Sequence, residues 1–236
     1  MYSFENVIRY SEIDPDEKLS VFGLINYFQD CTNFQSADLN VGVDELIAAE
    51  RGWLLSYWQI DIHDMPKFRQ KVTAGTWAYE FERFMGRRNF VMLDENNNVL
   101  ACADSLWVFM DTKTGKPAKA EGRLVDVYEL EPRFEGMEYE PRKIKCADKW
   151  EEREEIVVRR YHLDTNNHVN NARYIQMAQE FLPEGFNPKM IRAEYKLSAL
   201  LGDTIHAFSG RTENGRIQVD LRNDAGKTYA LVEFAD

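Results

Sequence analysis

Most of the chain alternates apolar and polar residues with a period of two, which is typical of half-buried β-strands. The alternation is clear in the second part of residues 53–65, and strand-like runs continue through 71–84 and 87–111. The turn-forming run DENNN at 94–98 separates two apolar runs, so we expect a hairpin there. Residues 204–236 repeat the pattern around the turns TENG and NDAG. The pattern therefore predicts antiparallel sheets.

Two segments break this pattern with the spacing of an amphipathic helix, in which apolar residues recur at i, i+3, i+4 and i+7. They are residues 19–39 and residues 170–182, so each half of the chain has one predicted helix. The apolar positions are Val21, Leu24, Ile25 and Phe28 in the first segment, and Tyr174, Met177, Ala178 and Phe181 in the second.

The two helical regions are related to each other. A shift of 150 positions lays residues 9–30 over residues 159–180, so that Asp14 meets Asp164. The strands that follow recur as well, as GRRNFVML and GRIQVDL show. We interpret this as an internal duplication, in which each copy is one long helix followed by antiparallel strands. Because the stretch between the copies is rich in proline and charge, we predict an N-terminal domain at 1–118, a connecting segment at 119–147 and a C-terminal domain at 148–236.

The composition is that of an ordinary globular protein, with 236 residues, 44% hydrophobic and 29% charged. No apolar run approaches the roughly 18–20 residues of a membrane-spanning helix, and the first residues lack the features of a signal or transit peptide. We therefore expect a cytoplasmic protein with no membrane span. The net charge of −11 disfavours nucleic acid as a partner. The three cysteines are too widely spaced for a metal site, and their odd number argues against a disulfide framework.

The two copies differ where the chain enters the helix. The first copy reads DPDEK at 14–18, whereas the second reads DTNNH at 164–168. His168 can accept and donate a proton near neutral pH, which a lysine does poorly. Asn166 offers an amide donor and a carbonyl acceptor that could fix a water molecule, and Asp164 could orient either side chain. The second copy is therefore the candidate active site.

The backbone N–H groups that open the second helix, at Val169, Asn170 and Asn171, are unpaired by helix geometry and could hold a developing oxyanion. Two other interpretations of the stretch stay open. Asp, Thr and Asn are favoured at helix caps and turns for local reasons alone. The second alternative is a metal site formed by His162, Asp164 and His168, which would be short of ligands.

The stretch LDTNNHVNNARYI, residues 163–175, resembles the L-D-x-N-x-H-V-N-N-x-x-Y signature of the plant and bacterial acyl-[acyl-carrier-protein] thioesterases and fits it at every fixed position. RYSEID, NYFQDC and SLWVFMD in the first half are also similar to stretches of that family. The resemblance covers most of the chain and implies an α+β fold: two tandem hotdog folds in one chain, each a long helix wrapped by an antiparallel sheet. It implies catalytic roles for Asp164, Asn166 and His168, with no cofactor and no metal.

The chain departs from the family at one position. The family places a glutamate on the strand after the helix, whereas Ser198 stands at that position here. A serine cannot replace a carboxylate as general base, and no adjacent base would activate it as a nucleophile. Glu194 would share the strand face but lie roughly 13 Å away, at about 3.3 Å per residue. Either His168 alone is the base, with Ser198 helping to position water, or the activity is weakened or altered.

The resemblance implies hydrolysis of fatty acyl thioesters on acyl carrier protein, in fatty acid biosynthesis, by attack of water on the thioester carbonyl. The alternatives are an acyl-coenzyme A thioesterase and a non-hydrolytic acyl-binding protein. A hotdog dehydratase fits less well, because its motif usually carries a proline and a second aspartate. Self-association into a homodimer stays open. The candidates for the acyl pocket are Phe22, Phe28, Trp53 and Trp77, and those for docking the carrier are Arg83, Arg87, Arg88, Arg142, Lys143 and Lys145.

Overall fold

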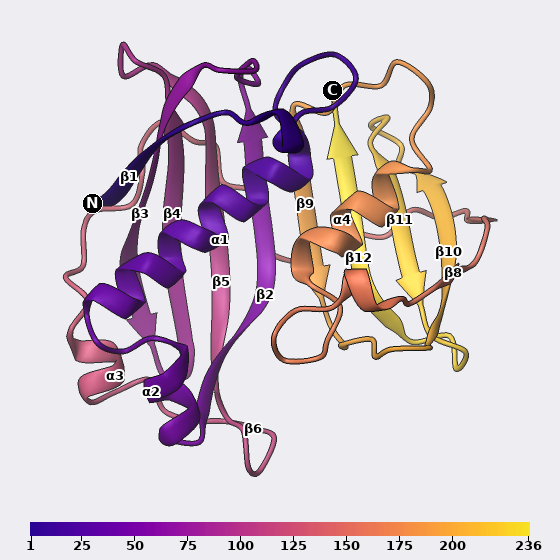
Figure 1. Cartoon of the computed structure of the whole chain (residues 1–236). Helices are drawn as coiled ribbons and strands as arrows, with labels where there is room; N and C mark the ends of the chain where they lie inside the picture. Colours follow the sequence, from indigo (N-terminus) through magenta and orange to yellow (C-terminus); the bar gives the residue numbers. More distant parts are fainter. The chain divides into compact units, whose positions relative to one another are not determined.

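A computed structural model describes all 236 residues of the chain. The chain forms two compact units, each with one main helix lying across an antiparallel sheet (Figure 1). Unit 1 comprises Met1–Ser56 and Ile60–Tyr139, and unit 2 comprises Tyr57–Gln59 and Glu140–Asp236. None of the helices combines the length and the apolarity that crossing a membrane would require.

The sheet of unit 1 has the strand order β1-β3-β4-β5-β2, with β6 paired to β5, and the β1–β3, β3–β4 and β4–β5 pairs are antiparallel. The strands are β1 (Tyr2–Val7), β2 (Arg51–Ile62), β3 (Lys71–Glu82), β4 (Met85–Leu93), β5 (Val99–Asp111) and β6 (Lys116–Pro117), and the helices are α1 (Val21–Asp38), α2 (Val43–Ala48) and α3 (Arg123–Asp126).

The predicted helix of unit 1 is confirmed as α1. The side chain of Ser20 caps it by accepting a hydrogen bond from the N–H of Gly23 at 3.0 Å. The helix packs against β1 and β3 and buries Leu24, Ile25 and Phe28, whose spacing predicted this face. The expected turn at 94–98 also forms, and it closes the β4–β5 hairpin.

The sheet of unit 2 has the strand order β9-β12-β11-β10-β7, with β8 also paired to β10, and all of these pairs are antiparallel. The helix α4 lies against β11 and β12. The elements are β7 (Glu151–Glu152), β8 (Ile156–Val157), α4 (Asn171–Gln179), β9 (Met190–Tyr195), β10 (Thr204–Arg211), β11 (Ile217–Arg222) and β12 (Thr228–Ala235).

The helix α4 ends three residues before the predicted end of the segment 170–182. Two tight backbone hydrogen bonds close the last turn, from Phe181 N–H to Ala178 at 3.2 Å and from Leu182 N–H to Gln179 at 3.0 Å. Pro183 follows directly, and the residue before a proline is disfavoured in helical conformation. The proline therefore explains why the apolar periodicity runs further than the helix.

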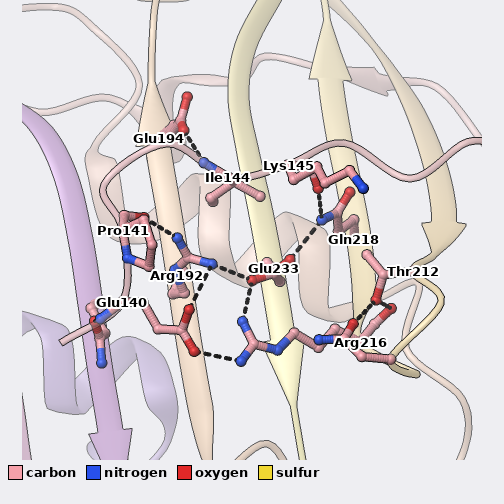
Figure 2. A network of polar contacts seen from close by, with 12 residues as sticks. Glu140, Pro141, Ile144, Lys145, Arg192, Glu194, Thr212, Arg216, Gln218 and Glu233 are labelled. Atoms are coloured by element: carbon pink, nitrogen blue, oxygen red, sulfur yellow. Dashed lines mark hydrogen bonds and ion pairs between the residues drawn. The ribbon is translucent and has the colours of Figure 1, made fainter. Parts of the chain in front are cut away.

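A buried polar network lies on one face of the unit 2 sheet (Figure 2). Glu233 on β12 is 3% exposed, and its carboxylate accepts hydrogen bonds from Arg192 at 2.6 Å, from Arg216 at 3.0 Å and from Gln218 at 2.6 Å. Arg216 also pairs with Glu140 at 2.5 Å. A buried carboxylate needs such partners, because an uncompensated charge out of water is costly.

The same network holds the backbone of residues 140–147, which we call the clamped segment. Arg192 donates to the carbonyl oxygen of Pro141, and the amide of Gln218 donates to the carbonyl oxygen of Lys145 at 2.8 Å (Figure 2). These residues contain no helix or strand, so side chains of the sheet satisfy backbone groups that would otherwise lack partners. The end of the predicted connecting segment is thus an ordered layer on the unit 2 sheet.

Candidate active site

The loop that carries the Asp-x-Asn-x-His motif is closed by its own backbone. Leu163 and Val169 form a β-bridge, and the N–H of Asp164 donates to the carbonyl oxygen of His168 at 2.8 Å. The N–H of Asn167 donates to the carbonyl oxygen of Asp164 at 3.1 Å, with Asn167 at a φ of 60°. Asparagine is among the few residues that tolerate this left-handed conformation, so its place in the loop has a local cause.

The carboxylate of Asp164 orients the loop through the backbone. Its Oδ1 accepts the N–H of Asn166 at 2.8 Å and the N–H of His168 at 3.3 Å. The side chain of Asn166 is exposed and that of His168 is half-buried, and neither makes a hydrogen bond or ion pair with another residue. Asp164 therefore holds the backbone of Asn166 and His168 and leaves their side chains free to bind other groups.

The amides at the start of α4 differ from the expectation. The N–H of Val169 donates to the carbonyl oxygen of Ala199 at 3.0 Å, and that of Asn170 donates to the carbonyl oxygen of His162 at 2.9 Å. These two N–H groups already donate hydrogen bonds within the protein, so the prediction that they hold an oxyanion is wrong. The N–H of Asn171 has no acceptor and remains a candidate. The start of α4 provides one oxyanion donor rather than three.

Ser198 lies beside the motif loop but beyond the end of β9. It is exposed, and its neighbour Ala199 is held on both sides: its carbonyl oxygen accepts from Val169, and its N–H donates to the hydroxyl of Tyr174 at 2.8 Å. The position at which the family has glutamate is therefore fixed next to the motif loop. A carboxylate at 198 would stand at the edge of the site.

Glu194 is not a substitute for the missing carboxylate. Its side chain accepts the N–H of Ile144 in the clamped segment (Figure 2). It also lies 3.7 Å from the ammonium of Lys196. The hydroxyl of the next residue, Tyr195, instead donates to the carbonyl oxygen of Asn171 in α4 at 2.9 Å. Because successive strand residues point to opposite faces, Glu194 lies on the sheet face opposite α4.

Two tyrosines support the site, and neither was among the predicted site residues. Tyr174 holds Ala199 against the loop, and Tyr195 holds the first turn of α4. Burial raises the pKa of both hydroxyls, so they stay neutral hydrogen-bonding groups. Tyr174 is the last fixed residue of the signature, which is a sequence signal for a polar role, although its spacing marked it as core.

His162 is a structural residue. It is 8% exposed, and its Nδ1 accepts the N–H of Arg159 at 3.0 Å. Burial lowers the pKa of the imidazole, and the nearby Arg173 and Arg159 lower it further. No group of three or more His, Cys, Asp or Glu side chains is placed to hold a metal ion.

The four acyl-pocket candidates do not line one surface. Phe28 packs on Phe90, with ring centroids 5.2 Å apart, beneath α1. Trp77 stands opposite Asn89 in the β3–β4 pair and belongs to a cluster with Met137. Because Asn89 and Phe90 are adjacent on β4, Trp77 and Phe28 lie on opposite faces of the sheet. Phe22 is half-buried on α1, and Trp53 is half-buried against Phe109 at 4.6 Å.

The docking candidates also separate into two kinds. Arg88 is 6% exposed and donates to Gln35 on α1, so its guanidinium is not available to a partner. The prediction that Arg88 docks the carrier is therefore wrong. Arg87 is half-buried and paired with Glu80 at 3.0 Å. The exposed candidates are Arg83, Arg142, Lys143 and Lys145.

The corresponding loop of the first copy has the same backbone. Ile13 and Leu19 form the bridge, and the N–H of Asp14 donates to the carbonyl oxygen of Lys18 at 2.8 Å. Glu17 takes the left-handed conformation at a φ of 63°. The 150-residue offset is thus confirmed in the hydrogen bonds of the loops. The first loop, however, presents Lys18, whose ammonium is paired with Asp64 at 3.1 Å.

An α-helix on an antiparallel sheet, present twice in one chain and entered in one copy through an Asp-x-Asn-x-His loop, defines a double-hotdog protein. Residues 1–128 match the acyl-ACP thioesterase N-terminal domain, and residues 145–235 match the acyl-ACP thioesterase C-terminal domain. The chain belongs to the acyl-ACP thioesterase family.

Curated relatives agree with this assignment. The chain is 30% identical over 192 residues to a chloroplastic acyl-[acyl-carrier-protein] hydrolase of Cuphea viscosissima, a match that covers 75% of this chain and 46% of that protein. It is 27% identical over 231 residues to a chloroplastic oleoyl-acyl carrier protein thioesterase of Arabidopsis thaliana, covering 89% and 64%. The chain therefore spans about half to two thirds of the length of these relatives.

Solved structures match the fold along almost the whole chain. An acyl-ACP thioesterase from Bacteroides thetaiotaomicron superposes with a TM-score of 0.89 at 22% identity, over 98% of this chain and 96% of that one. A 12:0-ACP thioesterase from Umbellularia californica superposes with a TM-score of 0.84 at 18% identity, over 99% and 95%. The predicted α+β fold with two tandem hotdog units is confirmed.

Proposed function

We propose that this chain hydrolyses the thioester between a fatty acyl chain and acyl carrier protein and releases the free fatty acid. The observation that carries the proposal is the second-copy loop, where Asp164 fixes the backbone and leaves the side chains of Asn166 and His168 uncommitted. Membership of the acyl-ACP thioesterase family supports the substrate class.

In the proposed reaction, His168 accepts a proton from a water molecule whose oxygen attacks the thioester carbonyl carbon. The carbonyl oxygen becomes an oxyanion, which the N–H of Asn171 and the side-chain amide of Asn166 stabilise. The oxyanion then collapses and the carbon–sulfur bond breaks. The imidazolium of His168 returns its proton to the leaving thiolate, which yields a carboxylic acid and a free thiol.

Two alternative functions would use the same loop. Acyl-coenzyme A carries the same thioester on the same type of pantetheine arm, so the loop chemistry alone does not distinguish the two carriers. A non-hydrolytic acyl-binding protein is favoured by Ser198, which stands beside the loop where the family has a carboxylate. The domain division at 1–118, 119–147 and 148–236, the homodimer and the cytoplasmic location stay predictions.

The test is thiol release from acyl-[acyl-carrier-protein] substrates of increasing chain length, with the matching acyl-coenzyme A thioesters in parallel. We expect release that depends on chain length and is faster from the carrier protein. Equal or faster release from coenzyme A would favour the first alternative. Tight binding of the acyl chain with no thiol release by folded protein would favour the second.

A further inference from the structure

The entry to α4 carries two arginines whose charges are not neutralised. In the first copy Arg9 is paired with Glu12 at 3.0 Å. The residue equivalent to Glu12 is His162, which makes the same bond to the backbone but brings no negative charge to Arg159. Arg159 and the adjacent Arg160 are both exposed and make no ion pair. In a chain of net charge −11, two exposed arginines without an ion pair are available to an acidic partner.

An exposed apolar loop borders these arginines. Residues 196–203 connect β9 to β10 and are tied to the residue directly before Arg159, because Gly202 N–H donates to the carbonyl oxygen of Val158 at 3.1 Å. The same loop is tied to the motif loop through Ala199. Three of its leucines are exposed by 42%, 50% and 51%, which are Leu197, Leu200 and Leu201.

The clamped segment is less suited to dock a carrier. Its cations, Arg142, Lys143 and Lys145, lie on the sheet face that Glu194 occupies, whereas the motif loop leads into the helix on the other face. A carrier bound there would have to pass its substrate arm around the sheet. Arg159 and Arg160 need no such path, because they are only four or five positions before Asp164 in the chain.

We propose that Arg159, Arg160, Leu197, Leu200 and Leu201, here named the entry surface, dock an acidic acyl carrier protein over the motif loop. The arginines attract and orient the acidic partner, and the leucines bury apolar surface at the contact. The inference rests on the proposed function for the identity of the partner. It assigns the docking role to a surface that the sequence pattern did not indicate.

The experiment measures binding, so that it does not depend on hydrolysis. A fluorescently labelled acyl carrier protein, with its acyl chain attached through a non-hydrolysable amide, is titrated with the full chain at low ionic strength. The variant Arg159→Glu/Arg160→Glu is expected to weaken binding by about tenfold or more, with a smaller difference at high salt. A change of less than about twofold would overturn the proposal.

The matched control is Lys189→Glu/Arg211→Glu, which changes the charge equally. Both residues are exposed and lie at the end of the sheet where Met190 pairs with Ala235, roughly 20 Å along β9 from Tyr195. We expect binding to change by less than about twofold. An equal loss in this control would show that net charge alone sets the affinity and would overturn the proposal.

A second variant avoids placing new charges at exposed positions. His162→Glu recreates the first copy's arrangement, in which a glutamate accepts the backbone N–H and pairs with the arginine. It is expected to weaken carrier binding several-fold by neutralising Arg159. Circular dichroism confirms that each variant is folded. Unchanged binding in folded His162→Glu would contradict the role of Arg159.

Two further measurements distinguish carrier docking from lipid binding and from the proposed hydrolysis. Vesicles of phosphatidylglycerol and phosphatidylcholine replace the carrier, and binding to them with the same arginine dependence would make the entry surface a lipid-binding surface instead. Thiol release from an acyl-pantetheine tests the proposed function by itself. If the chain binds the carrier through the arginines but releases no thiol, hydrolysis fails and the docking surface stands.

Discussion

At the entry to α1, the ammonium of Lys18 is paired with Asp64 at 3.1 Å, whereas at the entry to α4 the imidazole of His168 makes no ion pair. The two loops share a bridge, a left-handed residue and the same backbone hydrogen bonds. The comparison shows that the loop backbone is a property of the duplicated fold. What makes one copy a candidate active site is the side chains that it presents.

Each unit buries a carboxylate on its sheet, and the two carboxylates differ in the partners that surround them. In unit 2, Glu233 is surrounded by two arginines and a glutamine. In unit 1, Asp104 is 3% exposed and accepts from the hydroxyl of Tyr79 at 2.7 Å, with Arg133 at 3.9 Å. Burial raises the pKa of Asp104 to about 6. The unit without the candidate site thus holds the less well compensated acid.

Exchanging the distinguishing residues should produce the largest effect. His168→Lys is expected to lower kcat/KM by about 10²–10⁴, because a lysine is almost fully protonated at neutral pH and is a poor general base. The reciprocal Lys18→His is the matched control and should not change activity by more than about twofold. Activity of His168→Lys within a factor of two of the wild type would show that the base lies elsewhere.

Removing the carboxylate that shapes the loop should have the next largest effect. Asp164→Ala deletes the acceptor for two backbone N–H groups, and the resulting displacement of Asn166 and His168 is expected to lower kcat by about 10²-fold. Asp164→Asn keeps an oxygen acceptor and should recover part of the loss. Steady-state kinetics on one acyl-carrier substrate measures both. Equal losses in the two variants would argue that the negative charge matters instead of the loop geometry.

Restoring the family carboxylate should give a smaller change of the opposite sign. Ser198→Glu places an acid beside the motif loop and is expected to raise kcat by up to about tenfold, since His168 already supplies a base. The exposed Asn187→Glu, which lies before β9 and outside the entry surface, controls for added charge. A decrease in kcat for folded Ser198→Glu would show that serine is the residue to which this site is adapted.

The smallest expected effect concerns stability and pH in unit 1. The pKa of Asp104 is raised in the folded state, so the folded protein binds more protons than the unfolded chain between about pH 4 and pH 6. The free energy of unfolding should therefore fall as the pH rises through this window. Asp104→Asn should reduce this slope in chemical denaturation measured at several pH values. The same slope in the variant would exclude Asp104 as its source.

Much of the fold could be predicted from the sequence, because strand alternation, two helical periods and the 150-residue offset are local or repeated signals. The predicted ends of the helices were less accurate. Phe181 fits the helical period, yet α4 ends at Gln179 because Pro183 follows. The motif loop was predicted as well, since its residues are contiguous. The hydrogen-bond and ion-pair partners of the side chains could not be predicted, because they depend on contacts between residues that are distant in the sequence.

The errors in the site have this common cause. The N–H groups of Val169 and Asn170 are free by helix geometry but are taken by Ala199 and His162, which lie on other segments. Arg88 is cationic in the sequence but buried against α1. The Trp77 and Phe28 rings are both large and apolar but lie on opposite sheet faces. Charge and size are readable along a chain, whereas the partner and the face are set by tertiary packing.

The central claim is that the second-copy loop hydrolyses the acyl-carrier thioester with His168 as its base. The most direct measurement is thiol release from a single acyl-[acyl-carrier-protein] substrate by the wild type, by His168→Ala and by Lys18→Ala, with folding checked for each. The account predicts release by the wild type and by Lys18→Ala at similar rates, and a loss of about 10²–10⁴ in His168→Ala. Release that survives undiminished in His168→Ala, or that is lost equally in Lys18→Ala, would contradict it.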